Sequence, residues 1–253
     1  PVDNTPGETI LSVQGLSTKY APKLQNITFD VKKGEIFGLY GLVGAGRTEL
    51  LETIFGMRTR AAGNVIYNGK TMNFSSPKDA MDHGFALITE ERKADGLFIK
   101  ADITFNTTIA NMNQYRSGIA LSHDEMVRAT ADEIRVMHTK CMGPDDMISN
   151  LSGGNQQKVV LAKWLYAEQD IYIFDEPTRG IDVNAKAEFY KQMSNLTKQG
   201  KCILMISSDM PELISMSDRV LVVRDGRIDC ELKGEQINEQ EIIKRALGVN
   251  KDG

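Results

Sequence analysis

The chain has 253 residues, enough for one large domain or two small ones. Hydrophobic residues make up 41% of it and charged residues 25%, as in globular proteins that bury a sizeable core. The formal net charge of −4 argues against binding of nucleic acid or of an anionic membrane through bulk charge. The cysteines, Cys141, Cys202 and Cys230, lie far apart and indicate neither a zinc site nor a disulfide framework. No apolar run approaches the roughly 20 residues that a membrane span needs.

The first residues are typical of a linker. Residues 1–9 are dominated by proline, glycine and polar residues, and they have neither the basic start nor the apolar core of a signal peptide. The chain does not start with methionine, so we expect it to have been cut or processed from a longer protein. Residues 10–253 are expected to form a single domain.

Short apolar runs after the linker predict strands. The predicted strands are 10–13, 27–31, 36–40, 65–67, 85–89, 171–174, 202–206 and 220–223. Two of them, 171–174 and 202–206, are continuously apolar, which is typical of strands covered on both faces in a parallel sheet. Apolar spacing and stop signals predict helices at 48–55, 155–168 and 185–198, and a tail helix at 238–247. Strands alternating with helices predict an α/β core with a mostly parallel sheet.

The stretch from about 101 to 150 differs from this pattern. It reads as polar helices with scattered methionines. We interpret it as a helical subdomain of about 91–154, inserted between two portions of the core, at about 10–90 and 155–253.

A glycine-rich segment follows the predicted strand 36–40 and leads into the predicted helix 48–55. Residues 41–48 fit the pattern G-x-x-x-x-G-K-[ST], except that arginine stands where lysine is expected. Glycines let backbone amides point at phosphate oxygens, and the helix N-terminus adds its positive end. The alternative is a glycine-rich turn in another α/β fold. The predicted phosphate-binding residues are Gly41, Gly44, Ala45, Gly46, Arg47 and Thr48, with the Thr48 hydroxyl directed at Mg²⁺.

Two further segments follow in an order that fits nucleotide binding. Residues 151–158, LSGGNQQK, place two glycines and a serine at a helix start, a second anion-binding cap whose alternative is a plain cap by Ser152. The apolar strand 171–174 runs into Asp175 and Glu176, which places both acids at the sheet edge where open α/β folds bind ligands. Asp175 suits Mg²⁺ and Glu176 suits polarising a water molecule. The alternative is a strand end that turns into solvent.

Together these segments resemble the ATP-binding domain of ABC transporters. The variants GLVGAGRT, ITEERK, LSGGNQQK, DEPTRGID and ISSDMPEL resemble the C-terminal ATPase domain of tandem sugar importers, of galactose/methyl-galactoside or ribose type. The resemblance implies a P-loop NTPase fold: an ABC ATPase core with an N-terminal antiparallel β region and an inserted helical subdomain. It implies ATP and Mg²⁺ as cofactors, and a peripheral location at the cytoplasmic face of the inner membrane. The implied partners are an N-terminal ATPase domain of the same or a similar chain, transmembrane permease subunits and, indirectly, a sugar-binding protein, with no nucleic acid.

The resemblance also assigns roles to individual residues. Thr48, Asp175 and Glu90 are implied at the metal, and Glu176 is implied as the catalytic carboxylate. Tyr20 is implied as the adenine-stacking aromatic, with a surface tyrosine in a hairpin as the alternative. Asp182 is implied in signalling between domains, with helix capping or turn formation as the alternative. The residues implied to contact ATP in the partner's site are Leu151, Ser152, Gly153, Gly154, Asn155 and Gln156.

Three positions depart from the family pattern. Arg47 replaces the phosphate-loop lysine, Glu90 stands at a position that is usually glutamine, and Ser208 stands where a histidine usually contacts the terminal phosphate. We therefore expect this domain to hold ATP in a degenerate site and to lend its signature, residues 151–156, to a partner's site. The isolated domain is then expected to hydrolyse ATP weakly or not at all. The alternatives are a fully catalytic homodimeric ABC ATPase and, more remotely, a soluble DNA-maintenance ATPase.

Overall fold

The computed structural model describes residues 6–90, 95–117, 120–165 and 167–249. The chain divides into two compact units. The first contains residues up to 87 together with 170–176 and 193 onward, and the second contains 88–169 and 177–192. In the part of the chain that is described, no helix is both long and apolar enough to cross a membrane.

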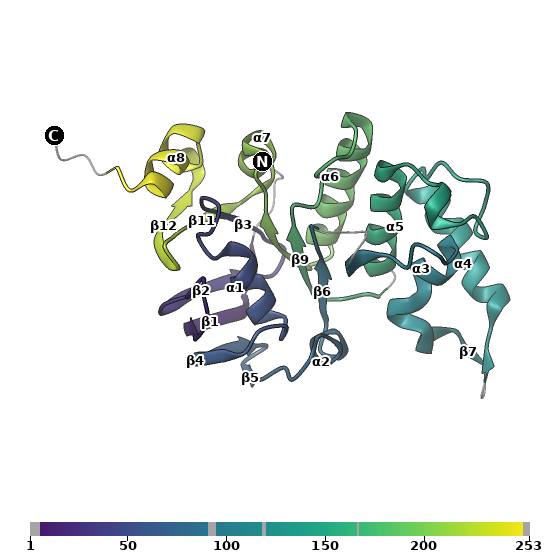
Figure 1. The fold of residues 1–253 in the computed structure, drawn as a ribbon, viewed down its shortest axis with the longest axis horizontal. Coiled ribbons are helices and arrows are strands. Elements are labelled where there is room, and N and C mark those ends of the chain that lie inside the picture. The colour runs from purple at the N-terminus through teal and green to yellow at the C-terminus, as the bar shows by residue number, and fades with distance from the viewer. Residues whose placement is uncertain (1–5, 91–94, 118–119, 166, 250–253) are drawn as a thin grey trace. The chain divides into compact units, whose positions relative to one another are not determined.

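The first unit contains an antiparallel sheet of four strands (Figure 1). Its order is β2-β1-β4-β5, formed by β1 (Thr9–Thr18), β2 (Ile27–Lys32), β4 (Arg60–Tyr67) and β5 (Lys70–Met72). Along β2, buried and exposed residues alternate strictly. This alternation is expected of a sheet with one face on the core and the other in water.

A second sheet of six strands has the order β12-β11-β3-β10-β9-β6. Its strands are β3 (Ile36–Tyr40), β6 (Phe85–Ile88), β9 (Ile171–Asp175), β10 (Cys202–Ile206), β11 (Arg219–Arg224) and β12 (Arg227–Lys233). The pairs β9·β10, β10·β3 and β3·β11 are parallel, whereas β11 and β12 are antiparallel. Every residue of β9 and β10 is buried, as their continuously apolar sequences predict.

Three helices of the first unit begin at a residue whose side chain caps them. The helices of the unit are α1 (Arg47–Ile54), α2 (Pro77–Asp82), α7 (Met210–Met216), the 3-10 turn η4 (Gly234–Gln236) and α8 (Glu239–Leu247). The side chains of Ser76, Asp209 and Asn238 accept hydrogen bonds from first-turn amides of α2, α7 and α8. Helix α6 (Val183–Lys198) has residues in both units.

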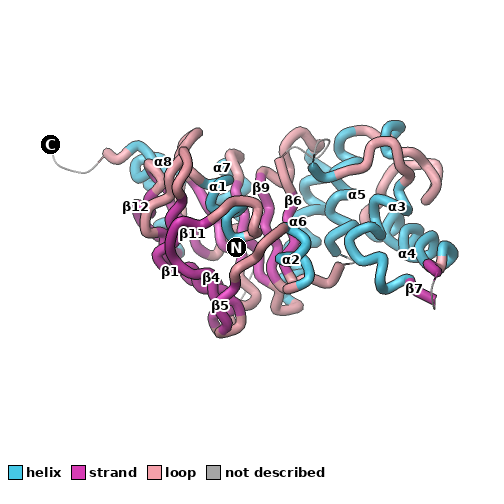
Figure 2. The backbone as a smooth tube through the Cα atoms, turned by 60° about the horizontal axis from the view of Figure 1, so that its bottom comes forward, coloured by secondary structure: helices cyan, strands magenta, loops and turns pink. Residues whose placement is uncertain are grey.

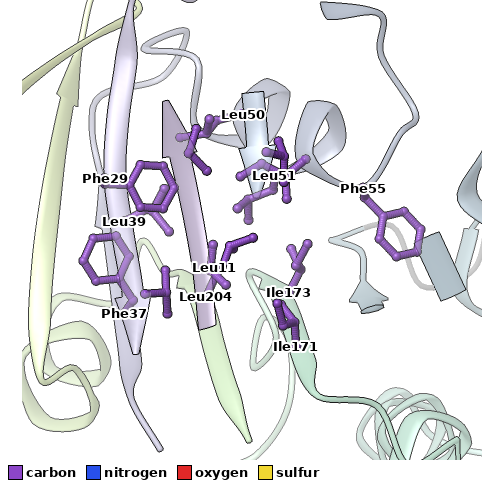
Figure 3. Close-up of a cluster of buried hydrophobic side chains, with 14 of the residues drawn as sticks. Leu11, Phe29, Phe37, Leu39, Leu50, Leu51, Phe55, Ile171, Ile173 and Leu204 are labelled. Atoms are coloured by element: carbon purple, nitrogen blue, oxygen red, sulfur yellow. The ribbon is translucent and has the colours of Figure 1, made fainter. Parts of the chain in front are cut away.

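The apolar core of the first unit gathers residues from α1 and from both sheets. Figure 3 shows Leu51 of α1 with Ile173 and Leu204 of the parallel sheet, all fully buried. The rings of Phe29 and Phe37 stack with centroids 5.3 Å apart, joining the antiparallel sheet to the parallel one. This packing fixes α1, and with it the glycine-rich loop that precedes it.

The second unit is mainly helical (Figure 2). It contains α3 (Ile103–Thr108), η2 (Ile109–Tyr115), the short pair β7 (Arg116–Ser117) and β8 (Ala120–Leu121), α4 (His123–Val136), η3 (Ile148–Asn150) and α5 (Gly153–Leu165). Helix α3 packs against both α4 and α5. Because of this packing α5 groups with the second unit, although the sequence analysis placed residues from 155 onward with the core.

The predicted strands and helices are all present, and several others were not predicted. β1 and β4 are longer than predicted, and α5 ends before residue 168. The sequence analysis missed α2, α7, β5 and β12. These are short elements, or, in β12, a strand at the edge of the sheet whose charged residues hide its apolar pattern. Part of the predicted linker, residues 1–5, lies outside the described residues, and β1 already begins at Thr9.

Core packing at Leu204 makes a testable contribution to stability. Leu204→Ala should lower the free energy of unfolding by about 2–5 kcal/mol, because a buried leucine loses its contacts and leaves a cavity. Urea denaturation followed by circular dichroism measures the change. Leu247→Ala is the matched control, since Leu247 is 56% exposed and should cost well under half as much. Equal losses in the two variants would contradict the assigned core.

Candidate functional site

The glycine-rich loop, residues 41–48, has the backbone geometry of an anion cradle. Gly44 and Gly46 have positive φ values of 81° and 101°, a region that favours glycine. At Gly41 a Cβ atom would lie 2.4 Å from the carbonyl oxygen of Val223, so only glycine fits beside β11. Gly46 is the N-cap of α1 and has no capping side chain. The first amides of α1 are therefore available to a ligand.

The turn between β11 and β12 is hydrogen-bonded to this loop. The amide of Gly226 donates to the carbonyl of Ala45 at 3.0 Å, and the amide of Gln25 donates to the carbonyl of Gly226 at 2.8 Å. The loop that carries Gln25 also carries Tyr20, a residue that is 70% exposed. The ammonium of Lys19 lies 5.7 Å from the centre of that ring. The exposure of Tyr20 suits both the stacking role and a plain surface position.

Asp175, the last residue of β9, is the most perturbed carboxyl group near the loop. It is only 5% exposed, and one of its oxygens, Oδ1, is buried without a hydrogen-bond partner among the described residues. Burial raises the pKa of Asp175 to about 6, while a hydrogen bond from Thr48 and the charge of Arg47 oppose the rise. Asp175, Arg47 and Thr48 are therefore close together in the first unit.

Glu176 is held in place by backbone and side-chain contacts. Its φ of 49° is unusual for a residue other than glycine, and its amide donates to the carbonyl of Ile206 at 3.0 Å. Its Oε2 accepts hydrogen bonds from both the amide and the hydroxyl of Ser208, each 2.9 Å long. Ser208 therefore holds the carboxylate of Glu176 directly.

The oxygen atoms at the end of β9 suit a hard divalent cation. The unpartnered Oδ1 of Asp175 lies in the same cluster as the Thr48 hydroxyl, and Mg²⁺ prefers oxygen ligands of this kind. The residues present therefore fit the metal that the sequence analysis expected.

In the second unit, the signature loop uses several of its own polar groups for support. The side-chain nitrogen Nε2 of Gln156 donates to the carbonyls of Ile148 and Leu151 at 3.1 and 3.2 Å, and this side chain is buried. Asn155 accepts from the amide of Lys140 and donates to the Ser152 hydroxyl. The side-chain nitrogen of Gln156, which the sequence analysis expected at a ligand, is therefore bonded within the loop itself. Ser152 is exposed, whereas Leu151 is buried.

Asp182 lies beside the signature and also caps a helix. Its Oδ1 accepts from the amide of Ala185 at 3.0 Å in the first turn of α6, and backbone donors hold its pKa below the usual range. A Cβ atom built on Gly154 would lie 3.2 Å from its Oδ2. Asp182 therefore caps α6, as the alternative interpretation expected, and it also lies close to Gly154 of the signature.

Glu90 is engaged within the second unit by an ion pair with Arg179. The sequence analysis expected Glu90 at the metal and did not consider Arg179. It also missed Gln157, a buried residue whose amide nitrogen donates to the carbonyl of Pro177 at 2.6 Å. Arg179 and Gln157 both lie inside motifs that the sequence analysis recognised. The signal available in the sequence was a polar side chain within each motif, which the structure shows to be paired in Arg179 and buried in Gln157. Of the ITEERK motif, residues 91–93 lie outside the described residues.

Burial of Asp175 predicts a pH dependence of stability. The pKa of the folded state, about 6, lies above the ordinary value of 3.8, so this carboxyl favours folding below about pH 4 and that contribution is lost as pH rises through about 6. Relative to Asp175→Asn, the wild-type free energy of unfolding should fall by about 3 kcal/mol over this range. Urea titrations of both proteins from pH 3.5 to 7.5 in EDTA measure it. A pH-independent difference would rule out the shifted carboxyl.

The folds that match this chain are ATP-binding cassettes. One is a dimeric cassette bound to ADP and Pi, with a TM-score of 0.78, 19% identity, and coverage of 88% of this chain and 98% of that one. Another is a nucleotide-free cassette from an ABC transporter, with a TM-score of 0.78, 19% identity, and coverage of 96% and 97%. At such identities the likeness shows the fold alone, and it confirms the predicted P-loop architecture.

Sequence relatives are much closer. The galactose/methyl galactoside import ATP-binding protein MglA of Treponema denticola is 48% identical over 243 residues, which cover 96% of this chain and 49% of that protein. MglA of Escherichia coli is 42% identical over 245 residues, covering 96% and 48%. The chain thus spans about half the length of the curated relatives it matches. A sequence profile of the ABC transporter family matches residues 24–179, more than half of the chain, and the chain belongs to that family.

Proposed function

We propose that this chain binds Mg-ATP as one of two ATPase domains that drive a bacterial sugar importer. The grouping of Thr48, Asp175 and Glu176 beside the glycine-rich loop is the observation that carries the proposal. Relatives named as galactose/methyl galactoside import proteins support a sugar as the transported substrate. These relatives are about twice as long as the matching region, which leaves room for a second domain. The further partners would be permease subunits at the cytoplasmic face of the membrane and, indirectly, a sugar-binding protein.

Nucleotide binding follows from the loop and the start of α1. Backbone amides of residues 41–48 would bind phosphate oxygens, and the positive end of α1 would add to their attraction. Arg47 retains the positive charge of the usual lysine, but its longer planar group cannot reproduce the same contacts. The exposed ring of Tyr20 would stack on adenine. Asp175 and Thr48 would hold Mg²⁺, which when bound neutralises charge on the phosphates.

Glu176 is the residue proposed to polarise the attacking water. Both hydrogen bonds from Ser208 are accepted by Oε2, so Oε1 is the oxygen that would polarise the water. The usual histidine at position 208 would contact the terminal phosphate, whereas serine is shorter and is already bonded to Glu176. The loss of a positioned group of this kind lowers rates by about 10²–10⁴. We therefore infer that this site turns over slowly, although it retains its general base.

The second unit supplies the signature to a partner's site in this proposal. Ser152 is exposed at the start of α5. Asp182 lies beside Gly154, where it would respond to a change in the conformation of the signature loop when the partner's nucleotide binds. The ion pair with Arg179 engages the Glu90 carboxylate, which supports a reduced role for Glu90 at the metal. In this proposal the domain contributes its signature to the partner's catalytic site, while its own nucleotide site is degenerate.

A fully catalytic homodimer remains the alternative function. The observation in its favour is Glu176, which is present and firmly held. The remote alternative, a DNA-maintenance ATPase, finds no support between the phosphate loop and the signature. Within the described ranges there, the longest helix is α4, with 14 residues, too short for an extended coiled coil.

ATP turnover by the chain separates these possibilities. We expect Mg-ATP to bind while turnover stays at or near background, and Glu176→Gln to leave the affinity for ATP within about three-fold of the wild-type value. The measurements are phosphate release and equilibrium binding of a fluorescent ATP analogue. Glu235→Gln, at an exposed carboxylate of the same unit, is the control. Rapid turnover that disappears only in Glu176→Gln would establish the homodimeric ATPase instead.

The role of the signature is tested in the complete transporter. Ser152→Arg should lower ATP turnover by about 10²-fold or more, because a bulky cation would enter the partner's phosphate site. The control is Ser149→Arg, which adds the same charge at an exposed position three residues earlier. Unchanged turnover in Ser152→Arg would contradict the proposal that this domain lends its signature.

A further inference from the structure

The loop that carries Tyr20 is closed at its two ends by hydrogen bonds. The amide of Thr18 donates to the carbonyl of Leu24 at 3.1 Å, and the amide of Leu24 donates to the Thr18 hydroxyl at 2.9 Å. Residues 19–23, with the exposed Tyr20 among them, therefore form a short excursion from this closure. The position of Tyr20 thus depends on where Leu24 and the next residue, Gln25, are held.

Leu24 gives this loop one apolar contact with the glycine-rich loop. Leu24 is buried, and a Cβ atom built on Gly46 would lie 2.8 Å from its Cδ2 atom. Apolar packing is not directional, so a single contact of this kind does not fix the orientation of the Tyr20 loop. A cavity of about 520 Å³ is lined by residues 23–26, so the loop also has open space beside it. The orientation of the loop therefore depends on directional contacts.

The turn between β11 and β12 supplies hydrogen bonds to both loops. The carbonyl of Gly226 accepts from the amide of Gln25, and the amide of Gly226 donates to the carbonyl of Ala45 in the glycine-rich loop. A Cβ atom at Gly226 would overlap the carbonyl oxygen of Lys23, so only glycine lets the turn approach this closely. The turn is therefore a polar connection between the Tyr20 loop and the glycine-rich loop.

Arg227, the first residue of β12, adds a side-chain contact to this connection. Its Nε and Nη2 both donate to Oε1 of Gln25, at 3.2 and 2.5 Å. A hydrogen bond from a charged donor is roughly twice as strong as one between neutral groups. Both residues are exposed, so water competes for the contact and its contribution is moderate. Gln25 is thus held through its amide by Gly226 and through its side chain by Arg227.

We propose that Arg227 is a positioning residue for nucleotide binding. Through Gln25 it holds the Tyr20 loop in a fixed position relative to the glycine-rich loop, so that both loops fit one nucleotide. This role rests on the proposed function, in which Tyr20 stacks on adenine. A ligand that contacts two loops binds more tightly when their relative position is fixed beforehand, because less free energy is lost in ordering them on binding.

A comparison of two ligands isolates this role. Mg-ATP would use both loops, whereas Mg-tripolyphosphate has no adenine and would use the glycine-rich loop alone. The quantity to measure is the ratio of the dissociation constant for ATP to that for tripolyphosphate, by isothermal titration calorimetry. A change in charge, or damage to the glycine-rich loop, would weaken both ligands and largely cancel in this ratio. A displaced Tyr20 loop would raise it.

Four variants of the chain test the contact. Arg227→Met and Gln25→Leu should each raise the ratio about five-fold, as expected for the loss of an exposed contact. The double variant should raise it no further, because both substitutions remove the same contact. Gln25→Glu keeps an acceptor for Arg227 and should stay within about two-fold of wild type. The matched control is Lys233→Met, which removes an exposed cation at the other end of β12 and should leave the ratio unchanged.

Hydrogen exchange tests the same contact without nucleotide. In Arg227→Met, the amides of Thr18, Leu24 and Gln25 should exchange at least about three-fold faster than in wild type, because their bonds close and anchor the Tyr20 loop. The amides of the buried strand β9 should exchange at the wild-type rate, which shows that the fold is intact.

Three results would overturn the proposal. These are an unchanged ratio in Arg227→Met and Gln25→Leu, additive effects of the two substitutions, or unchanged exchange of the loop amides. Equal losses of affinity for ATP and tripolyphosphate also leave the ratio unchanged and count against it. If the wild-type chain bound neither ligand, the proposed nucleotide function would fail, and the exchange rates alone would then decide whether Arg227 holds the loop.

Discussion

The parallel register of β3, β10 and β9 is the constraint on which the site depends. Leu39 of β3 lies beside Ile206 of β10, and Ile206 lies beside Asp175 of β9. The three strands therefore end at one edge of the sheet, and the chain segments that follow them emerge together. This arrangement brings the glycine-rich loop, Glu176 and Ser208 into one region, although about 170 residues separate the first from the last.

Placing these groups together has an energetic cost that neighbouring residues offset. Asp175 is buried and Glu176 has a left-handed backbone, each costing on the order of 1–3 kcal/mol. Thr48 and Arg47 favour the charged form of Asp175, and the amide and hydroxyl of Ser208 hold Glu176. Such local strain is tolerated because β9 and β10 are buried along their whole length and cannot shift easily.

Polar residues in the second unit serve two purposes. Asn155 and Gln156 shape the signature loop, and Gln157 ties α5 to the carbonyl of Pro177. Residues that a motif groups together thus divide between those exposed on the surface, such as Ser152, and those that hold the loop. The same division applies to Asp182, which caps α6 while its carboxylate lies beside Gly154. A sequence motif alone does not distinguish these roles, because both require a polar side chain.

The sequence by itself determined the α/β class, the buried parallel strands and the position of the glycine-rich loop, because these depend on local apolar runs and on glycine. It also indicated Asp175 and Glu176, since a strand that ends in two acids is a local feature. Only the tertiary structure decided which groups meet. The bonds from Ser208 to Glu176 and from Gln157 to Pro177 join segments distant in the sequence, as does the ion pair of Glu90 with Arg179.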